Sequence, residues 1–180
     1  MRVITGKYKG RHFVVPHSFK ARPTTDFAKE NIFNVLRGYA DFDGLSVLDL
    51  FAGTGSISLE FLSRGCSRVV SVEKDYQHCA FIRNVFQKLN DSAACLLQTD
   101  VLRYLPRCTE EFDIVFADPP YTLRELASLP DLVLCGAVVA PGGIFVLEHG
   151  KDNDFSCHPA FVEHREYGSV NFTIFRKNAQ

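Results

Sequence analysis

The sequence predicts a doubly wound α/β domain built on a mostly parallel sheet. Between residues 44 and 149, continuous apolar runs that are typical of buried strands alternate with helical stretches. The first of these runs leads directly into a glycine-bearing turn, AGTG at 52–55, as strands do at the ligand site of such sheets. The chain finishes with two β-prone runs around Gly168, which predicts an antiparallel hairpin at the edge of the sheet.

Residues 1–40 are expected to form an extension ahead of this domain, which would span residues 41–180. Residues 1–15 alternate loosely around two glycines, and this pattern predicts a small β-hairpin. The TTD sequence at 24–26 offers helix N-cap residues, and apolar side chains follow at helical spacing until the chain nears Gly38. The extension is therefore predicted to be a hairpin followed by one helix.

Within residues 41–180, strands and helices are expected to alternate until the terminal hairpin. The strands assigned to the parallel part of the sheet are 46–51, 68–73, 94–100, 112–118 and 143–149. Helical stretches are assigned between them at 57–65 and 75–90. Because helices cover both faces of such a sheet, ligands are expected beyond the carboxyl ends of its strands.

The composition is that of an ordinary single-domain globular protein, with 180 residues of which 46% are hydrophobic. No run is long enough to cross a membrane, and the sequence MRVITGKYKG lacks the apolar core of a signal peptide. The six cysteines are scattered and never paired as CxxC, which is typical of reduced thiols rather than disulfides or zinc ligands. We therefore expect a monomeric cytoplasmic protein with no metal and no membrane partner.

The net charge of −1 hides an uneven distribution. Residues 1–39 carry eight basic and two acidic side chains, whereas the rest of the chain carries 12 basic and 19 acidic ones. Such asymmetry favours contact between the N-terminal segment and a polyanion such as a nucleic acid. The alternative is a basic face that is merely solvated.

Three expected strands carry an acidic residue at or near their carboxyl end: Asp49 before LFAGTG, Glu73 in SVEKD and Asp100 in QTD. Gly53 and Gly55 in the turn let the backbone approach a ligand closely, because no Cβ intervenes. Glu73 lies 18 residues after Gly55, where a carboxylate can accept both hydroxyls of a ribose. This combination predicts a nucleoside cofactor; alternatively, Asp49 and Asp100 only form turns at the strand ends.

The turn favours S-adenosylmethionine over a dinucleotide. Ser58 stands at the place of the third glycine of a dinucleotide turn, and the turn carries no Lys or Arg for a pyrophosphate. Asp49 would repel a phosphate but suits an ammonium or sulfonium group. The residues predicted to bind this cofactor are Asp49, Phe51, Gly53, Gly55, Glu73, Asp100 and Val101.

The stretch DIVFADPPYT at 113–122 predicts the site of the target group. Its two prolines fix the backbone, so that Asp118 and the Pro119 carbonyl are displayed in fixed geometry beside the ring of Tyr121. DPPY resembles the [DNS]-P-P-[YF] motif of class I methyltransferases that act on planar amines, and this resemblance implies an exocyclic amine as the target. Such a delocalised amine is a poor nucleophile, and two acceptors that each take one N–H favour a pyramidal nitrogen with an available lone pair. The tyrosine offers a stacking surface for a base that is unpaired or flipped out. With this target, the predicted catalytic residues are Asp118, Pro119, Pro120 and Tyr121.

Longer stretches extend this resemblance over nearly the whole chain, from residue 2 to YGSVNFTIFR in the terminal hairpin. MRVITGKYKGRHFVVP, ARPTTDFAKENIFNVL, LDLFAGTGSISLEFLSRG and DPPY together resemble the RsmD-type family of 16S ribosomal RNA guanine-N2 methyltransferases. The resemblance implies a Rossmann-like class I methyltransferase sheet, S-adenosylmethionine as methyl donor, and ribosomal RNA, free or in an assembling small subunit, as partner. It implies RNA contacts by the basic N-terminal residues Lys7, Lys9, Arg11 and Arg22. Thr5 and Lys29 depart from a glycine and an arginine that are usual in the family.

Other functions remain open from the residues alone. Asp-Pro-Pro-Tyr also serves adenine-N6 methyltransferases of DNA or RNA, although this chain has little room for a separate target-recognition domain. Methylation of a protein glutamine is a weaker alternative, because that subgroup presents Asn at the place of Asp118. A non-catalytic nucleotide-binding module would not need so stiff a carboxylate, and an NAD-linked dehydrogenase would need the glycine that Ser58 replaces. Glu148, at the end of IFVLEH, either supports the site from the neighbouring strand or caps a turn.

Overall fold

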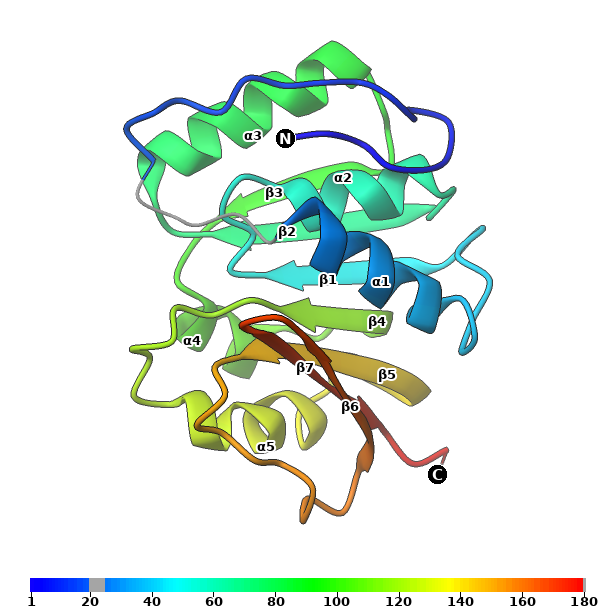
Figure 1. Cartoon of the computed structure of the whole chain (residues 1–180), viewed down its shortest axis with the longest axis vertical. Coiled ribbons are helices and arrows are strands. Elements are labelled where there is room, and N and C mark those ends of the chain that lie inside the picture. The colour runs from blue at the N-terminus through cyan, green and yellow to red at the C-terminus, as the bar shows by residue number, and fades with distance from the viewer. Residues whose placement is uncertain (20–24, 180) are drawn as a thin grey trace.

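The structure, a computed structural model, describes residues 1–19 and 25–179 (Figure 1). In this part of the chain, seven strands form a single sheet in the order β3-β2-β1-β4-β5-β7-β6. The strands are β1 (Ser46–Leu50), β2 (Arg68–Glu73), β3 (Ala94–Gln98), β4 (Phe112–Ala117), β5 (Val139–His149), β6 (Phe161–Tyr167) and β7 (Val170–Arg176). Neighbours among β1 to β5 pair in parallel, whereas β7 runs antiparallel to both β5 and β6. The predicted doubly wound sheet with its terminal antiparallel hairpin is confirmed.

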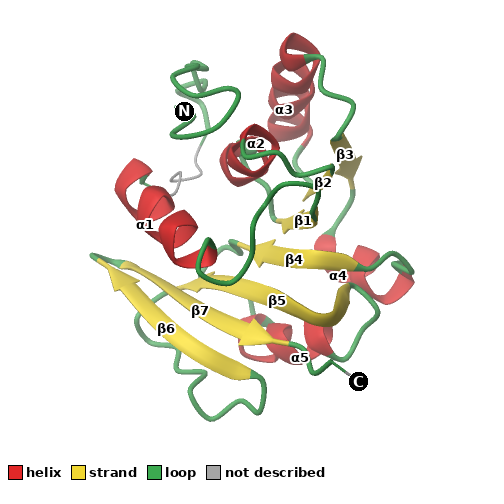
Figure 2. Ribbon diagram, turned by 90° about the vertical axis from the view of Figure 1, so that its right-hand side faces the viewer, coloured by secondary structure: helices red, strands yellow, loops and turns green. Residues whose placement is uncertain are grey.

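Helices cover both faces of this sheet (Figure 2). Those on one face are α1 (Asp26–Leu36), α2 (Ser56–Ser63) and α3 (Tyr76–Leu89), and those on the other are α4 (Val101–Tyr104) and α5 (Leu129–Leu134). Two single turns of 3-10 helix, η1 (Leu105–Arg107) and η2 (Leu126–Ser128), adjoin α4 and α5. The sequence predicted the three helices of the first face but neither α4 nor α5, because four and six residues are too few to display a helical period.

The N-terminal segment folds back on itself less regularly than the predicted hairpin. Arg2 and His12 form a single antiparallel bridge rather than two regular strands. Gly6 has a φ of 92°, and a Cβ at this position would fall 1.8 Å from the carbonyl oxygen of Ser63. Only glycine fits both conditions, so the segment is pressed against the end of α2 instead of projecting from the domain.

The helix α1 begins where the sequence predicts a cap. Thr25 precedes the helix, and its Oγ1 accepts a hydrogen bond from the N–H of Ala28 at 3.1 Å. Phe33 on the buried side of α1 packs against Phe61 of α2, with ring centroids 4.6 Å apart. This packing attaches the extension to the same face of the sheet as α2.

Side chains of the central strands alternate between the two faces of the sheet. In β4, Phe116 lies in the apolar layer on the α1 and α2 side, whereas Val115 and Ala117 lie in the layer on the α4 and α5 side. In β5, Val146 belongs to the first layer and Leu147 to the second. Side chains therefore alternate between the two faces in the same order along β4 and β5. This alternation determines the face on which the next side chain of each strand lies.

Candidate active site

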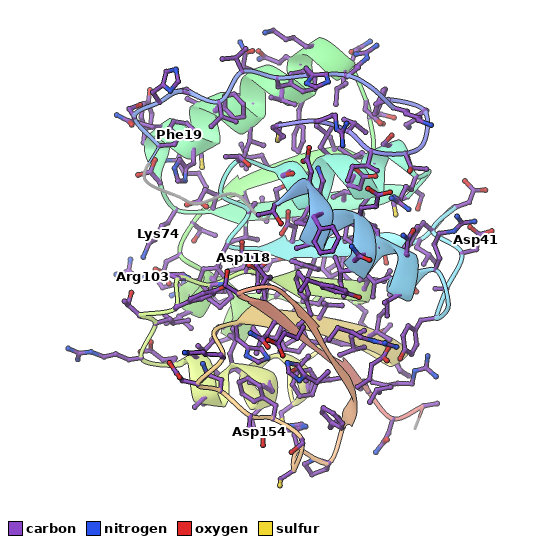
Figure 3. All side chains as sticks on the ribbon, in the orientation of Figure 1. Phe19, Asp41, Lys74, Arg103, Asp118 and Asp154 are labelled. Atoms are coloured by element: carbon purple, nitrogen blue, oxygen red, sulfur yellow. The ribbon has the colours of Figure 1, made fainter. Side chains whose placement is uncertain are left out.

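The carboxyl ends of the parallel strands meet at one edge of the sheet (Figure 1). Leu50 at the end of β1 pairs with Val72 of β2 and with Ala117 of β4. Figure 3 shows Lys74, which follows β2, at this edge, whereas Asp41 lies at the opposite side of the molecule. The residues predicted for the cofactor and for the target amine lie near the carboxyl ends of these strands or in the loops that follow, so the fold brings them to the same edge of the sheet.

The loop after β1 has an unusual backbone. Phe51, Gly53 and Gly55 have positive φ angles of 61°, 55° and 74°. A residue with a side chain seldom adopts this conformation, so Phe51 marks local strain of the kind found at functional sites. A Cβ at Gly55 would approach Cγ1 of Ile82 to 3.1 Å, whereas a Cβ at Gly53 would meet, among the described atoms, only the Phe51 carbonyl oxygen at 3.9 Å. The outer side of Gly53 is therefore open to a ligand.

Glu73 at the end of β2 holds this loop in place. Its Oε2 accepts the N–H of Gly53 at 2.8 Å, and its Oε1 accepts the N–H groups of Lys74 and Asp75, each at 2.8 Å. A carboxylate has about four acceptor positions, so three such bonds leave capacity for a hydroxyl donor. The sequence placed Glu73 beside a ribose; the structure adds its bond to the glycine loop.

Asp49 lies beneath the loop rather than facing outward. It is buried, and its Oδ2 accepts the N–H of Ser58 at 3.0 Å and the Ser58 hydroxyl at 2.5 Å. The Ser58 hydroxyl is also 2.6 Å from that of Ser71 on β2. Burial raises the pKa of Asp49 to about 7, and hydrogen bonds from Ser58 oppose the rise. Sequence reasoning used Ser58 only against a dinucleotide, whereas the structure makes it the partner of Asp49.

Asp100 caps the short helix that follows β3. Its Oδ1 accepts the N–H of Leu102 at 2.9 Å, and its Oδ2 lies 3.7 Å from Nζ of Lys74. Val101 is buried in the apolar layer on the α4 side, so its side chain packs in the core. The turn-forming alternative for Asp100 is thus present in the structure, and its contact with a cofactor stays a prediction.

Asp118 continues the β4 ladder by one residue. Its N–H donates to the carbonyl of Leu50 at 3.3 Å, which sets the carboxylate-bearing residue beside the start of the glycine loop. Pro119 is buried and Pro120 is exposed, and the Pro120 carbonyl accepts the N–H of Leu123 at 2.8 Å. The two prolines and this closing bond hold the turn in one conformation.

Tyr121 is the last residue of the DPPY turn, residues 118–121, which together with its surroundings is called the corner below. Half of its surface is exposed, at 50%, and its hydroxyl donates to Oε1 of Glu148 at 3.4 Å. A Cβ at Gly150 would lie 3.5 Å from Cδ2 of this ring, so the ring rests on the chain just after β5. The backbone at Gly150 therefore lies close to this half-exposed ring.

A row of aromatic rings that the sequence did not predict runs beside the corner. Phe116 packs on Phe172 at 6.1 Å, Phe172 on Tyr167 at 6.1 Å, and Tyr167 on Phe27 at 6.2 Å between centroids. Phe27, in the first turn of α1, is 66% exposed. Its partner Tyr167 is 140 positions away in the chain, so no local pattern could reveal the pair.

The basic N-terminal residues differ in their surroundings. Nζ of Lys7 pairs with Asp91 at 2.9 Å, and this partner raises the pKa of Lys7. Lys9 and Arg11 are exposed and, within the described residues, form no ion pair. Arg22 lies outside the described residues. Among the described residues, the predicted RNA-binding set therefore contains two cations without an ion pair, Lys9 and Arg11, and one that is already paired, Lys7.

Lys29, which the charge count included, does not face solvent. It is buried, and its Nζ donates to the carbonyl of Arg2 at 2.7 Å and to Oγ of Ser56 at 3.0 Å. Glu60 of α2 lies 3.8 Å from this ammonium, and its two oxygens accept the N–H groups of Ile4 and Thr5 at 2.9 and 3.0 Å. Burial lowers the pKa of Lys29, against the opposing effect of Glu60. The pair fastens the N-terminal segment to the helix that begins at the glycine loop.

Among residues 1–19 and 25–179, no group of three or more His, Cys, Asp or Glu side chains is arranged to hold a metal ion. All six cysteines are free thiols, and Cys66 and Cys79 are buried. In the same part of the chain, no helix has the length and apolar character needed to cross a membrane.

A family model and named relatives match nearly the whole chain. The family model described as conserved hypothetical protein 95 matches residues 1–176. "Putative rRNA methyltransferase YlbH" of Bacillus subtilis (strain 168) is 35% identical over 98% of this chain and 99% of its own length. "Ribosomal RNA small subunit methyltransferase D" of Escherichia coli (strain K12) is 29% identical over 100% of this chain and 91% of its own length.

Solved structures share the fold of this chain. The Escherichia coli "Putative methyltransferase yhhF" superposes with a TM-score of 0.87 at 25% identity, covering 100% of this chain and 99% of its own. The RNA methyltransferase of Salinibacter ruber, solved with S-adenosyl-L-homocysteine, shares the fold with a TM-score of 0.69 at 15% identity, over 88% of this chain and 95% of its own. The chain belongs to the RsmD-type family of 16S ribosomal RNA methyltransferases, as its sequence resemblance predicts.

Proposed function

We propose that this methyltransferase transfers a methyl group from S-adenosylmethionine to the N2 amine of a guanine in small-subunit ribosomal RNA. The observation that carries the proposal is the position of Asp118, whose N–H is bonded to Leu50 at the foot of the glycine loop. The acceptor for the target amine and the loop with room for a nucleoside therefore lie at the ends of neighbouring strands, β4 and β1. Methyl transfer requires this adjacency, because donor and acceptor must meet in line.

The glycine loop and its surroundings fit an adenosyl sulfonium compound. The backbone at Gly53 is open on its outer side, and the carboxylates of Glu73 and Asp100 stand at the next two strand ends, where they would hold the adenosine. Asp49 beneath the loop would favour the cationic groups, which in turn favour its ionised form. When bound, S-adenosylmethionine supplies an electrophilic methyl group.

Asp118 and the carbonyl of Pro119 would prepare the target nitrogen. Each accepts one N–H of the exocyclic amine, so that the nitrogen becomes pyramidal and its lone pair leaves conjugation with the ring. The buried Pro119 and the closed turn at Pro120 keep the two acceptors in place before the base arrives. Preorganised acceptors of this kind need no rearrangement as the reaction proceeds.

The aromatic groups beside the corner suit a base that has left its helix. Tyr121 offers a half-exposed ring on which the target base can stack, a contact worth about 1–3 kcal/mol per base. The exposed ring of Phe27 lies in the same aromatic row as Phe116, two residues before Asp118. It is positioned for a neighbouring nucleotide of a single-stranded or flipped-out segment.

The same proposal assigns the substrate and the setting. The RNA phosphates would lie along the N-terminal segment, where Lys9 and Arg11 are exposed. The enzyme would act as a cytoplasmic monomer on ribosomal RNA, free or in an assembling small subunit. Residues 1–40 would be the RNA-contacting extension, and residues 41–180 the catalytic domain.

Transfer of labelled methyl groups to a panel of total RNA, small-subunit RNA and ribosomal particles tests the proposal. Nucleoside analysis of the product should give N2-methylguanosine in small-subunit RNA. A product of N6-methyladenosine, or label confined to the proteins of the ribosomal particles, would contradict it. Equilibrium titration with S-adenosylmethionine and NAD separates a methyltransferase from a dehydrogenase, since only the former should bind the sulfonium compound.

A further inference from the structure

Glu148 stands next to Asp118 at the active edge of the sheet. Ala117 of β4 pairs with Leu147 of β5 in parallel register, so the next residues of the two strands, Asp118 and Glu148, are neighbours. Adjacent strands are about 4.8 Å apart. Side chains alternate between the two faces along a strand, so each of these residues lies on the same face as the residue two positions before it. Those residues, Phe116 and Val146, belong to the apolar layer on the α1 side. Two carboxylates are therefore presented side by side on one face.

The carboxylate of Glu148 is part of the corner that would receive the target base. It is 4% exposed, although it sits at the end of a strand, and its Oε1 accepts the hydroxyl of Tyr121. Tyr121 belongs to the same DPPY turn as Asp118, so a contact independent of the strand register joins Glu148 to this turn. A base stacked on Tyr121 would meet two acceptors along one edge.

We propose that Glu148 selects guanine over adenine by accepting the N1–H of the target base; this inference rests on the proposed function. On guanine, N1–H and the N2 amine are adjacent donors, which match two adjacent carboxylates. On adenine, the nitrogen beside the amine carries a lone pair, which would face a carboxylate oxygen without a proton between them. A site built to accept an N–H strongly rejects an analogue that lacks it, because the buried acceptor loses its partner. Glu148 is thus the specificity determinant that the DPPY motif does not contain.

The test compares two bases that carry the same nucleophile. 2-Aminopurine has the 2-amino group of guanine but a lone pair at N1. We would measure kcat/KM on a small-subunit RNA fragment, or on a particle reconstituted with it, carrying either base at the nucleotide that the wild-type enzyme modifies. The variants are Glu148→Gln and, as a matched control, Glu163→Gln, which changes a carboxylate of β6 that accepts the hydroxyl of Tyr39. Calorimetry with S-adenosylmethionine accompanies each variant.

Wild-type enzyme should prefer guanine at least 100-fold. Glu148→Gln should lower kcat/KM for guanine at least tenfold and reduce the preference at least tenfold, since its amide N–H can donate to the lone pair at N1. Cofactor affinity should not change, and Glu163→Gln should behave as wild type. Equal rates on both bases for the wild-type enzyme would overturn the inference even if no variant folds, as would a Glu148→Gln enzyme that slows equally on both. A wild-type enzyme that makes no N2-methylguanosine at all would instead refute the proposed function.

Discussion

The carboxylate of Glu73 and the backbone N–H of Gly53 are joined by a hydrogen bond of 2.8 Å, which ties the end of β2 to the loop after β1. A side chain predicted to hold a ribose therefore also shapes the loop beside it. Loss of this carboxylate should affect the cofactor in two ways, through the missing hydroxyl acceptor and through a loosened loop.

Glu73→Ala should weaken S-adenosylmethionine binding by about 1.5–3 kcal/mol, the range for hydrogen bonds with a charged partner. This equals roughly a 10- to 150-fold rise in Kd. Calorimetry on the folded variant measures it, with Glu111→Ala, an exposed change ahead of β4, as control. Unchanged affinity in a folded Glu73→Ala protein would remove Glu73 from the cofactor site.

Asp118→Ala should abolish methyl transfer and leave cofactor affinity nearly intact, because the carboxylate grips the target amine and not the donor. Asp118→Asn keeps one carbonyl acceptor at the same place and should retain part of the turnover. Single-turnover rates with labelled cofactor, beside calorimetry, separate the two effects. Near-normal turnover of the Asp118→Ala enzyme would rule out the proposed grip.

Features written in neighbouring residues could be predicted from the sequence. The strand that ends at DPPY, the turn at AGTG and the cap at Thr25 each depend on a few consecutive side chains, and all appear where expected. The glycines in the turn permit, and the prolines after the strand impose, particular backbone conformations at their own positions, so their effect can be predicted without knowing distant partners.

Features that depend on distant partners could not be predicted. Lys29 counts as a surface charge in the sequence, but it is buried against Arg2 and Glu60, which lie 27 and 31 positions away. The contact between Phe27 and Tyr167 likewise joins α1 to the terminal hairpin. Such pairs follow from the order in which strands and helices pack, and single-sequence patterns do not contain that order.

Asp49 should make the stability of the protein depend on pH. Burial raises its pKa from 3.8 to about 7 in the folded state. Between these values the folded protein binds more protons than the unfolded chain, so stability falls as pH rises through this window. From pH 5 to pH 8, wild type should lose about 2–3 kcal/mol relative to Asp49→Asn, which cannot ionise. Parallel denaturant titrations at the two pH values measure this difference, and identical pH slopes for both proteins would contradict the assignment.

The buried pair of Lys29 and Glu60 should matter for stability more than an exposed pair. Glu60→Ala removes the acceptor of the Lys29 ammonium, of the Arg64 guanidinium 2.9 Å away, and of the N–H groups of Ile4 and Thr5, which should cost about 3–5 kcal/mol. The control is Glu30→Ala, an exposed change in α1, which should stay within about 0.5 kcal/mol of wild type. Unfolding midpoints and slopes in urea provide the comparison. Equal midpoints for the two variants would mean that the N-terminal segment is held by other contacts.

The last prediction separates RNA recognition from chemistry and distinguishes the basic residues of the N-terminal segment from one another. Contacts to phosphate position the RNA without reading its bases, and each contributes salt-sensitive affinity. Lys9 and Arg11 are exposed, whereas Lys7 is paired with Asp91 at 2.9 Å. The double change of Lys9 and Arg11 to alanine should therefore flatten the slope of log K against log salt by about 1.4–1.8, at roughly 0.7–0.9 per lost contact.

Lys7→Ala serves as the matched variant, since it removes a cation of the same segment whose charge is already balanced. It should change the salt slope much less than the double change, and neither variant should alter S-adenosylmethionine affinity, because the predicted cofactor residues lie at the strand ends and not on this segment. Salt titrations of RNA binding beside cofactor calorimetry give both readouts. Identical slopes for wild type and the double variant would mean that the N-terminal segment is only a solvated basic face. A larger effect of Lys7→Ala would instead show that the lysine leaves Asp91 for a phosphate when RNA binds.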